Sequence, residues 1–431
     1  MKKRNCLALL MASFAMAVFA QSGTNSPYSQ YGWGLHSDQT SGFNRGMNGV
    51  GIGFRENNQV NFINPASYSA MDSTMFLFDA GVSAQLSNFK ENGVRLNARN
   101  ADFEYAVAGL RLFKGVGMSF GIIPFTNVGY NYSSTSKVGA SETTTFTNTY
   151  KGSGGLHQAY LGLGWQFVKG LSVGINASYL WGGFERSVVN SYSDGYVNTL
   201  SKYYSIDVAD YKLDFGLQYT AQITPKDQLT LGATYSLGHR LGDKPECKVI
   251  STNPQTVVAD TTFYSLSGNM ELPHVFGAGL AWNHRNRWKV GVDYTLQKWG
   301  DVSFPEFVTQ NGVSDYVLKN DYFENRHKVN LGGEYCMDER SRNFFGRIRY
   351  RAGVSYATPY FKVNGQDGPK EISVSAGFGI PIVNSYNNRS FLNISAQWVR
   401  NSADGLLTDN TFRINIGLTF NERWFQKWKF E

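Results

Sequence analysis

Residues 412–420 have the sequence Phe-Arg-Ile-Asn-Ile-Gly-Leu-Thr-Phe, with an apolar side chain at every second position. Side chains of a β-strand point alternately to opposite faces, so this stretch has one apolar and one polar face. The same period of two recurs in segments 213–219, 229–237 and 348–356 and continues from about residue 74 to the end of the chain. The sequence therefore predicts an all-β protein made of many amphipathic strands.

A soluble β-sandwich and a membrane β-barrel both produce this alternation, and three features favour the barrel. The strands are too many for one sandwich, and their polar faces are rich in glycine and carry charges in mid-strand. Aromatic residues also gather toward strand ends on the apolar face, where a barrel has its interfacial girdle. These residues are Trp165, Phe167, Tyr179, Trp181, Trp282 and Trp398. The mean hydropathy of −0.32 agrees, because only every second residue of a barrel strand meets lipid.

The connections between the predicted strands alternate strictly between short and long. Six short and seven long connections give fourteen strands, an even number as expected for an outer-membrane barrel with short periplasmic turns and long outer loops. The short connections are 114–115, 169–170, 224–227, 284–287, 338–343 and 384–389, and the long ones are 87–100, 133–156, 184–204, 238–273, 300–322, 359–370 and 402–408. A segment near 262–270 is a candidate hairpin arm within its long loop.

The first twenty residues predict export from the cytoplasm. Basic residues 2–4 precede an apolar stretch at 6–17, and Val-Phe-Ala at 18–20 is a small-x-small cleavage site before Gln21. We therefore expect the outer membrane of a Gram-negative bacterium. The expected parts are a signal peptide (1–20), an N-terminal segment without alternation that lies beneath or inside the barrel (21–72), the barrel (73–421) and a periplasmic tail (422–431).

Several other activities find no support in the sequence. The net charge of +7 is reduced further by removal of the basic signal, so no nucleic-acid partner is expected. Cys247 and Cys336 fall in segments predicted on opposite sides of the membrane, so we expect no disulfide between them. The Gly-x-Ser-x-Gly match at 117–121 lies in an alternating strand without a neighbouring helix, so we predict no enzyme. The six histidines lack metal-ligand spacing, and no metal or cofactor is predicted.

The N-terminal segment resembles the start of FadL- and TodX-type outer-membrane transporters. A glycine-rich run at 46–53 precedes residues 60–68, which contain Asn64-Pro65-Ala66, and a first strand follows near Met75. In that family an N-terminal hatch with an Asn-Pro-Ala motif plugs a fourteen-stranded barrel whose third strand is kinked inward. Hydrophobic substrates leave sideways into the membrane. The resemblance thus implies a passive transporter of hydrophobic, long-chain fatty-acid-like molecules, with Asn64, Pro65 and Ala66 in the hatch motif.

Pro124 in the third predicted strand has a physical meaning of its own. Proline cannot donate to a β-ladder, so within a sheet it marks an edge, a bulge or a break. Because a closed barrel has no edge, Pro124 and Phe125 predict a local defect in the wall, which the resemblance makes the lateral exit. The alternative is that Pro124 lies near the outer end of its strand and leads into the long loop.

A fatty-acid-like ligand needs an apolar pocket with one or two cationic groups. Arg349 and Arg351 are the candidate cations. The candidate apolar walls are the hatch residues Phe54, Phe62, Ile63 and Tyr68. A wider set of inward-facing charges either holds the hatch by salt bridges or represents the paired charges of any barrel interior. This set is Asp79, Lys212, Asp214, Asp293, Arg349, Arg351 and Arg413.

Two other functions stay open on the sequence. PorV-type barrels, which act in secretion and bind exported proteins, share the Asn-Pro-Ala element and the fourteen strands. A general diffusion porin would suit a charged lumen. The expected partners are outer-membrane lipids, a hydrophobic ligand and, during biogenesis, the barrel assembly machinery. The tail at 424–430 is similar to those of Bacteroidetes barrels.

Overall fold

The computed structural model describes residues 23–139, 143–242, 244–266, 269–382 and 390–422. The predicted signal peptide and the tail at 424–430 lie outside the described residues. Within the described part of the chain, no helix is long and apolar enough to cross a membrane.

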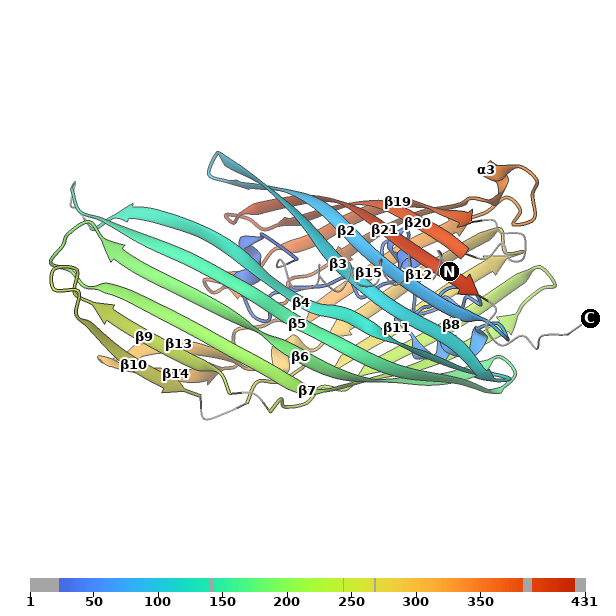
Figure 1. Ribbon diagram of the computed structural model, residues 1–431, viewed down its shortest axis with the longest axis horizontal. Coiled ribbons are helices and arrows are strands. Elements are labelled where there is room, and N and C mark those ends of the chain that lie inside the picture. Colours follow the sequence, from blue (N-terminus) through green and yellow to red (C-terminus); the bar gives the residue numbers. More distant parts are fainter. Residues whose placement is uncertain (1–22, 140–142, 243, 267–268, 383–389, 423–431) are drawn as a thin grey trace, which may run out of the picture.

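Fourteen long strands form the wall of a closed antiparallel barrel (Figure 1), as the alternating connections predict. Each strand pairs with the next, and the last pairs with the first. The wall strands are β2 (Phe76–Glu91), β3 (Val94–Phe113), β4 (Val116–Lys137), β5 (Thr145–Val168), β6 (Leu171–Tyr192), β7 (Thr199–Gln222), β8 (Asp227–Ser236), β11 (Val275–His284), β12 (Trp288–Gln297), β15 (Arg326–Tyr335), β16 (Arg349–Ala357), β19 (Lys370–Ile382), β20 (Ser390–Ser402) and β21 (Thr408–Glu422).

The remaining elements lie in the N-terminal segment and in the connections. They are η1 (Pro27–Gln30), β1 (Leu35–His36), α2 (Gly42–Arg45), η2 (Pro65–Ala70), β9 (Glu246–Thr252), β10 (Ala259–Ser265), η3 (Trp299–Asp301), β13 (Phe304–Gln310), β14 (Val313–Lys319), α3 (Phe344–Arg347), β17 (Lys362–Val363) and β18 (Gln366–Asp367). The expected hairpin arm near 262–270 overlaps β10, which pairs with β9.

The exposure of β21 shows that the barrel is apolar on its outside. Phe412, Ile414 and Ile416 on one face are 43–45% exposed, whereas Asn415 and Thr419 on the other face are each at most 3% exposed. A soluble sandwich would bury the apolar face. The apolar face of this sheet instead points outward, as lipid contact requires.

Three connections predicted as loops are largely strand. The stretch 87–100 holds only a tight turn at Asn92-Gly93, whose φ angles are 45° and 83°. The stretches 133–156 and 184–204 lie mostly within β4, β5, β6 and β7, which reach well beyond the other wall strands (Figure 1). Ser, Thr and Asn residues are frequent in these extensions and weaken the apolar alternation on which the prediction depended.

Candidate functional site

The N-terminal segment, residues 23–73, lies inside the barrel (Figure 1). Its large side chains pack against the inner faces of the wall strands and are almost completely buried. Trp33, Phe43, Met47, Val50 and Tyr68 are each at most 1% exposed. The segment therefore fills much of the lumen and is part of the folded core.

A row of four glycines across the wall provides the seat for η2. Gly117, Gly164, Gly174 and Gly216 are register partners on β4, β5, β6 and β7. A Cβ atom at any of them would come within 2.0–2.4 Å of residues 64–68. Only glycine permits this close approach of one backbone to another. The abundance of glycine on the polar strand faces thus has a local structural reason.

Asn64 ties the Asn-Pro-Ala turn to itself and to the wall. Its side-chain oxygen accepts a hydrogen bond from the Ala66 N–H at 3.1 Å, and its amide donates to the carbonyls of Ile52 at 2.9 Å and Leu217 at 3.1 Å. Asn64 is 0% exposed, and Pro65 occupies the first position of η2, where a missing N–H costs nothing. The structure therefore brings Asn64, Pro65 and Ala66 together as one buried turn held by β7.

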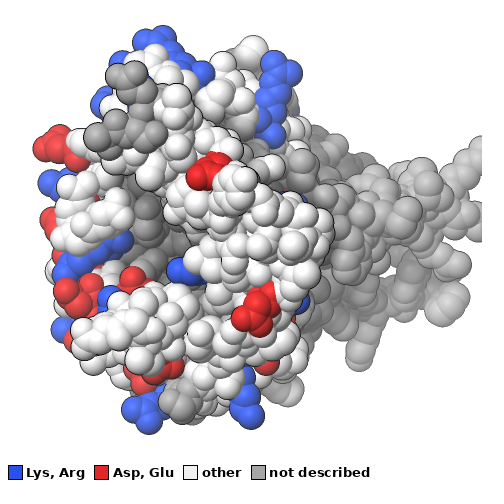
Figure 2. Space-filling view, turned by 90° about the vertical axis from the view of Figure 1, so that its left-hand side faces the viewer, with Lys and Arg blue, Asp and Glu red and all other residues white. Residues whose placement is uncertain are grey.

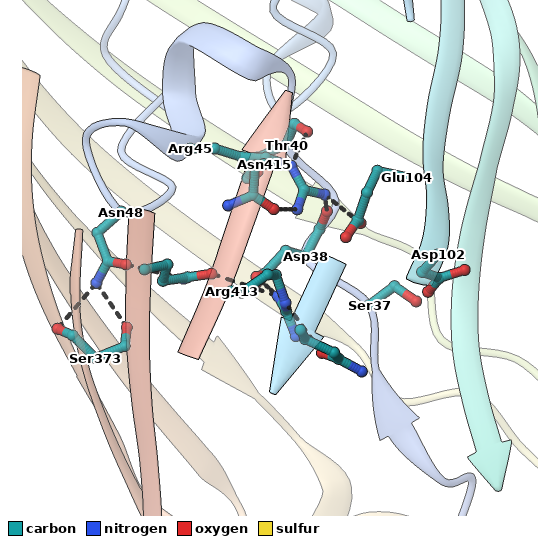
Figure 3. Close-up of polar contacts among 12 residues, drawn as sticks. Ser37, Asp38, Thr40, Arg45, Asn48, Asp102, Glu104, Ser373, Arg413 and Asn415 are labelled. Carbon is teal, nitrogen blue, oxygen red and sulfur yellow. Dashed lines mark hydrogen bonds and ion pairs between the residues drawn. The ribbon is translucent and has the colours of Figure 1, made fainter. Parts of the chain in front are cut away.

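Away from the Asn-Pro-Ala turn, charged side chains of the wall also hold the N-terminal segment in place (Figure 3). Arg413 of β21 pairs with Asp38 at 2.7 Å, and Arg45 of α2 pairs with Glu104 of β3 at 2.6 Å. Asp293 of β12 accepts hydrogen bonds from two successive backbone N–H groups, those of Gly51 at 2.6 Å and Ile52 at 2.9 Å.

The other members of the predicted inward-facing set are paired differently. Asp79 accepts from the Tyr105 hydroxyl, which in turn accepts the Gly42 N–H, so this contact reaches the segment indirectly. Lys212 pairs with Asp214 on the same strand. Part of the predicted set thus holds the segment, and part is ordinary interior pairing.

The wall is split between β3 and β4. Their ladder ends where Ala106 lies opposite Ile122. Beyond that point β3 pairs only with β2 and β4 pairs with β5, among the described residues. The β4–β5 register shifts between Pro124 and Thr126, which leaves Phe125 without a register partner. Pro124 therefore lies in the interior of β4, two residues after the last β3–β4 pair.

Residues 25–36 occupy this split and contact both of its edges. Leu35 and His36 form the short strand β1, which pairs with Asn127 and Thr126 of β4. The Ser29 hydroxyl accepts from the Gly129 N–H at 3.1 Å, and Asn25 donates to the Arg99 carbonyl of β3 at 3.3 Å. Most of these contacts use side chains or a two-residue strand, so the split is covered without a full β-ladder.

An outer groove lies where the extensions of β4–β7 face the β13–β14 hairpin. It encloses about 510 Å³, and Figure 2, which looks onto this end of the barrel, shows a hollow there. Its floor is the inner face of the extensions, and its other walls come from β13, β14 and the end of η1. Nine of its twenty lining residues are aromatic: Tyr31, Tyr130, Tyr150, Phe184, Tyr204, Phe304, Phe307, Tyr316 and Tyr322.

Comparison with known proteins places the chain in a family. The family model BamG matches residues 1–431. The chain belongs to the BamG family. Among curated proteins, no sequence matches it.

Solved structures similar to this BamG-family chain are FadL-type barrels. A TodX ΔS2S3 mutant monoaromatic hydrocarbon channel has a TM-score of 0.63 at 16% identity, over 90% of this chain and 100% of that one. The Ralstonia pickettii toluene transporter TbuX has 0.60 at 13%, over 89% and 98%. A Pseudomonas aeruginosa FadL homologue has 0.59 at 13%, over 88% and 98%. The similarity shows that the BamG-family chain has the FadL-type outer-membrane barrel fold, and all three structures are named as channels, transporters or homologues of them, not as enzymes.

The six residues predicted to line a ligand pocket do not line one cavity in the BamG-family chain. Phe62 and Tyr68 belong to one buried cluster, and Phe54 belongs to another. Arg349 and Arg351 both donate to Glu334, at 2.9 and 2.7 Å, and Arg349 also lies 3.8 Å from Glu56 of the N-terminal segment. Both guanidinium groups are therefore already paired. Ile63 lines the lumenal cavity of about 220 Å³, and the other five residues do not line that cavity.

The described part of the BamG-family chain has lumenal cavities of about 120 and 220 Å³. The smaller one is lined by charged residues from the segment and the wall: Asp38, Asp102, Glu104, Arg326, Glu371, Asp409 and Arg413. His36 contributes to both cavities. Burial, with help from Arg326 and Lys328, lowers the pKa of His36 to about 3, so the imidazole is neutral at physiological pH. The lumen is polar, and the apolar space lies in the outer groove.

The residues of the outer groove were missed by the sequence analysis. Most of them lie in stretches 133–156, 184–204 and 300–322, which were predicted as loops. One signal was present, since Tyr130 and Tyr132 are two residues apart, as are Phe184 and Arg186. Polar Ser, Thr and Asn residues around these pairs weakened the pattern.

Proposed function

We propose that this protein admits hydrophobic small molecules across the outer membrane. Such a molecule is captured in the outer groove, passes along the N-terminal segment and leaves sideways through the split between β3 and β4. The N-terminal segment acts as the hatch, with Asn64, Pro65 and Ala66 at its base and Pro124 and Phe125 at the exit. No cofactor or energy source is required, because movement down a concentration gradient is passive.

The observation that carries the proposal is the end of the β3–β4 ladder at Ala106 and Ile122. A barrel is stable because all backbone groups in its wall are paired, and an interrupted wall is costly in lipid. Here the interruption coincides with Pro124 and with a segment held by few ladder bonds. A covering of this kind separates from the wall at lower cost than a continuous strand.

The outer groove supports the capture step. Its aromatic walls provide large apolar surfaces that stack with flat or flexible hydrophobic ligands. Tyr31, one of these walls, lies close in sequence to β1, which covers the split. A ligand that displaces Tyr31 thereby acts on the same stretch of chain that closes the exit. Passage past the polar lumen then requires residues 23–39 to shift.

A reversible cross-link between β1 and β4 tests this route. Leu35 and Asn127 are register partners, so cysteines at these positions meet the distance requirement for a disulfide. The pair is introduced in a chain whose two described free cysteines, Cys247 and Cys336, are serine. Cells that express it are given N-phenyl-1-naphthylamine, whose fluorescence rises on entry into the membrane.

We expect oxidation to slow uptake of this dye and reduction to restore it. The matched controls are the two single-cysteine variants, in which neither treatment changes uptake. Equal uptake in the oxidised and reduced forms of the double variant would show that the split is not the exit.

The second candidate function is participation in outer-membrane barrel assembly. The match to the BamG family over the full chain favours it, since the family name points to the barrel assembly machinery. The polar lumen, filled with paired charges, favours it too, and gives no support to a diffusion porin. A related possibility is the PorV-like role of binding exported proteins at the outer surface.

Depletion of the protein separates these functions. Loss of dye uptake with normal amounts of other barrels supports transport. A fall in the amounts of many barrels, measured by mass spectrometry of outer membranes, supports assembly. Loss of selected surface proteins alone supports the PorV-like role.

A further inference from the structure

Arg186 is a buried cation in the wall of the outer groove. It lies on β6 between Gly152 of β5 and Tyr204 of β7 in the strand register. Only 9% of its surface is exposed. Its guanidinium carbon lies 4.4 Å from the centre of the Phe184 ring and 5.7 Å from that of Phe304. Aromatic rings therefore flank the charge in place of water.

The hydrogen bonds of Arg186 are incomplete. One Nη2 hydrogen bond goes to the carbonyl of Gly32 in the N-terminal segment. The buried Nε–H has no acceptor in the described part of the chain. A buried guanidinium normally has a carboxylate partner, because leaving the charge unpaired costs free energy.

The other cations of the groove already have acidic partners. Lys319 pairs with Glu306 at 2.6 Å, and Lys362 pairs with Asp321. Both of these acidic residues also line the groove. Among the described residues, Arg186 forms no ion pair, which leaves one unbalanced positive charge in a groove lined by nine aromatic residues.

We propose that the outer groove selects ligands that join an apolar or aromatic body to one anionic group, and that Arg186 binds this anion. The inference rests on the proposed role of the groove in capture. A carboxylate or sulfonate at this position would accept from Nε and a second guanidinium N–H in the paired geometry that arginine favours. The rings of Phe184, Tyr204 and Phe304 then surround the body of the ligand.

Burial of Arg186 should make the groove prefer an anionic ligand to a neutral one of the same shape. A neutral amide of the same shape offers one uncharged carbonyl acceptor, so the guanidinium loses water and gains neither the paired geometry nor a counter-charge. Sites with a buried polar group discriminate strongly against ligands that leave this group unpaired. The aromatic walls contribute equally to both ligands, so the difference in affinity reports on Arg186 alone.

The test compares 2-naphthoate with 2-naphthamide, which share ring and shape but differ in charge. Binding to the purified full chain in amphipol is measured by calorimetry. The variants are Arg186→Gln, which removes the charge, Arg186→Lys, which keeps it, and Lys319→Gln, which removes a groove cation that already has a partner. Heat-dependent gel mobility confirms that each variant is a folded barrel.

We expect the wild-type protein to bind naphthoate roughly tenfold or more tightly than naphthamide. Arg186→Gln abolishes the preference with naphthamide binding unchanged, Arg186→Lys retains part of it, and Lys319→Gln retains nearly all. Equal binding of the two compounds by the wild type, or a preference that survives in Arg186→Gln, overturns the inference and leaves hydrophobic capture intact. Absence of binding of either compound overturns both the inference and the capture step.

Discussion

Arg413, on the last strand of the wall, pairs at 2.7 Å with Asp38 of the N-terminal segment (Figure 3). The two residues are 375 positions apart in the chain. The contact joins the strand that closes the barrel to the stretch that follows β1, and it lies beside the smaller lumenal cavity.

Asp38→Asn is expected to loosen the outer half of the segment. Arg413 keeps its hydrogen bonds to Gln85 and Gln397 but loses its counter-ion, at a cost of about 1–3 kcal/mol. The measurement is the rate of tryptic cleavage after Arg45 in the folded protein, which should rise. Asp404→Asn, at an exposed loop position, is the control and should not change it.

Acid is expected to weaken the same region. The pKa of His36 is lowered to about 3 by burial and by Arg326 and Lys328, so its neutral form is favoured in the fold. Its contribution is complete above the unfolded pKa near 6.5 and is lost as the pH falls toward 3.

Asp38 acts in the same direction at lower pH. Burial raises its pKa, but Arg413, Lys328 and Arg45 outweigh burial and hold the pKa below its usual value. The free energy of opening of residues 32–40, calculated from hydrogen-exchange protection factors, should therefore fall by roughly 2 kcal/mol between pH 6.5 and 4.5, mainly through His36. In His36→Gln this pH dependence should largely disappear. An unchanged profile in that variant would assign it to other groups.

Gly174→Ala is expected to displace the Asn-Pro-Ala turn. The added Cβ would lie 2.3 Å from the carbonyl carbon of Pro65, which is backbone and cannot rotate away. Overpacking of this kind costs about 1–3 kcal/mol, measurable as a lower midpoint of thermal unfolding. Gly195→Ala, where a Cβ meets nothing within 4 Å, is the matched control. Equal midpoints for the two variants would contradict the close packing of η2 on the wall.

Two substitutions of Asn64 are expected to destabilise the protein to different degrees. Asn64→Asp keeps an acceptor for the Ala66 N–H but loses the donors to Ile52 and Leu217 and places a charge beside their carbonyls. Asn64→Ala loses the cap and both donors without adding a charge. We expect both variants to be destabilised, Asn64→Ala by about 1–3 kcal/mol and Asn64→Asp by more. Urea unfolding in detergent gives the order, and the reverse order would mean that the cap matters more than the donors.

The stability of the fold is expected to depend far more on Glu334 than on Glu339, a second glutamate nearby in the sequence. Glu334 is 4% exposed and accepts from both Arg349 and Arg351, whereas the Glu339 side chain is 50% exposed. Glu334→Gln leaves the buried Arg351 without an acidic partner among the described residues, while Arg349 keeps Glu339 and Glu56, at a cost of about 3–5 kcal/mol. Glu339→Gln should cost under about 1 kcal/mol. Thermal midpoints of the two variants measure the difference directly.

The barrel could be predicted from sequence because its signal is local. The alternation of residues 412–420 depends only on neighbours two positions apart, and it sets both the strand and its lipid face. Chain order then supplies the topology, since consecutive wall strands pair with each other. Pro124 was informative for the same reason, because its missing N–H is a property of one residue.

The proposed ligand residues failed to converge because their partners are distant in the sequence. Glu56 and Lys289, 233 positions apart, belong to the same ionic cluster as Arg349 and Arg351. No local pattern identifies Glu334 as the group that accepts from both arginines. The groove residues were not recognised for a different reason, since Ser, Thr and Asn residues around them weaken the apolar alternation of their strands.

The glycine seat under η2 has a consequence for the order of folding. Residues 64–68 lie against strands β4 to β7, while Arg45 and Asp38 contact strands at the seam where β2 meets β21. A wall that closed first would present bare backbone to an empty interior and would have to reopen for the segment to enter. We therefore expect residues 23–73 to be in place against β4 to β7 before β21 pairs with β2, so that the barrel is completed around the segment.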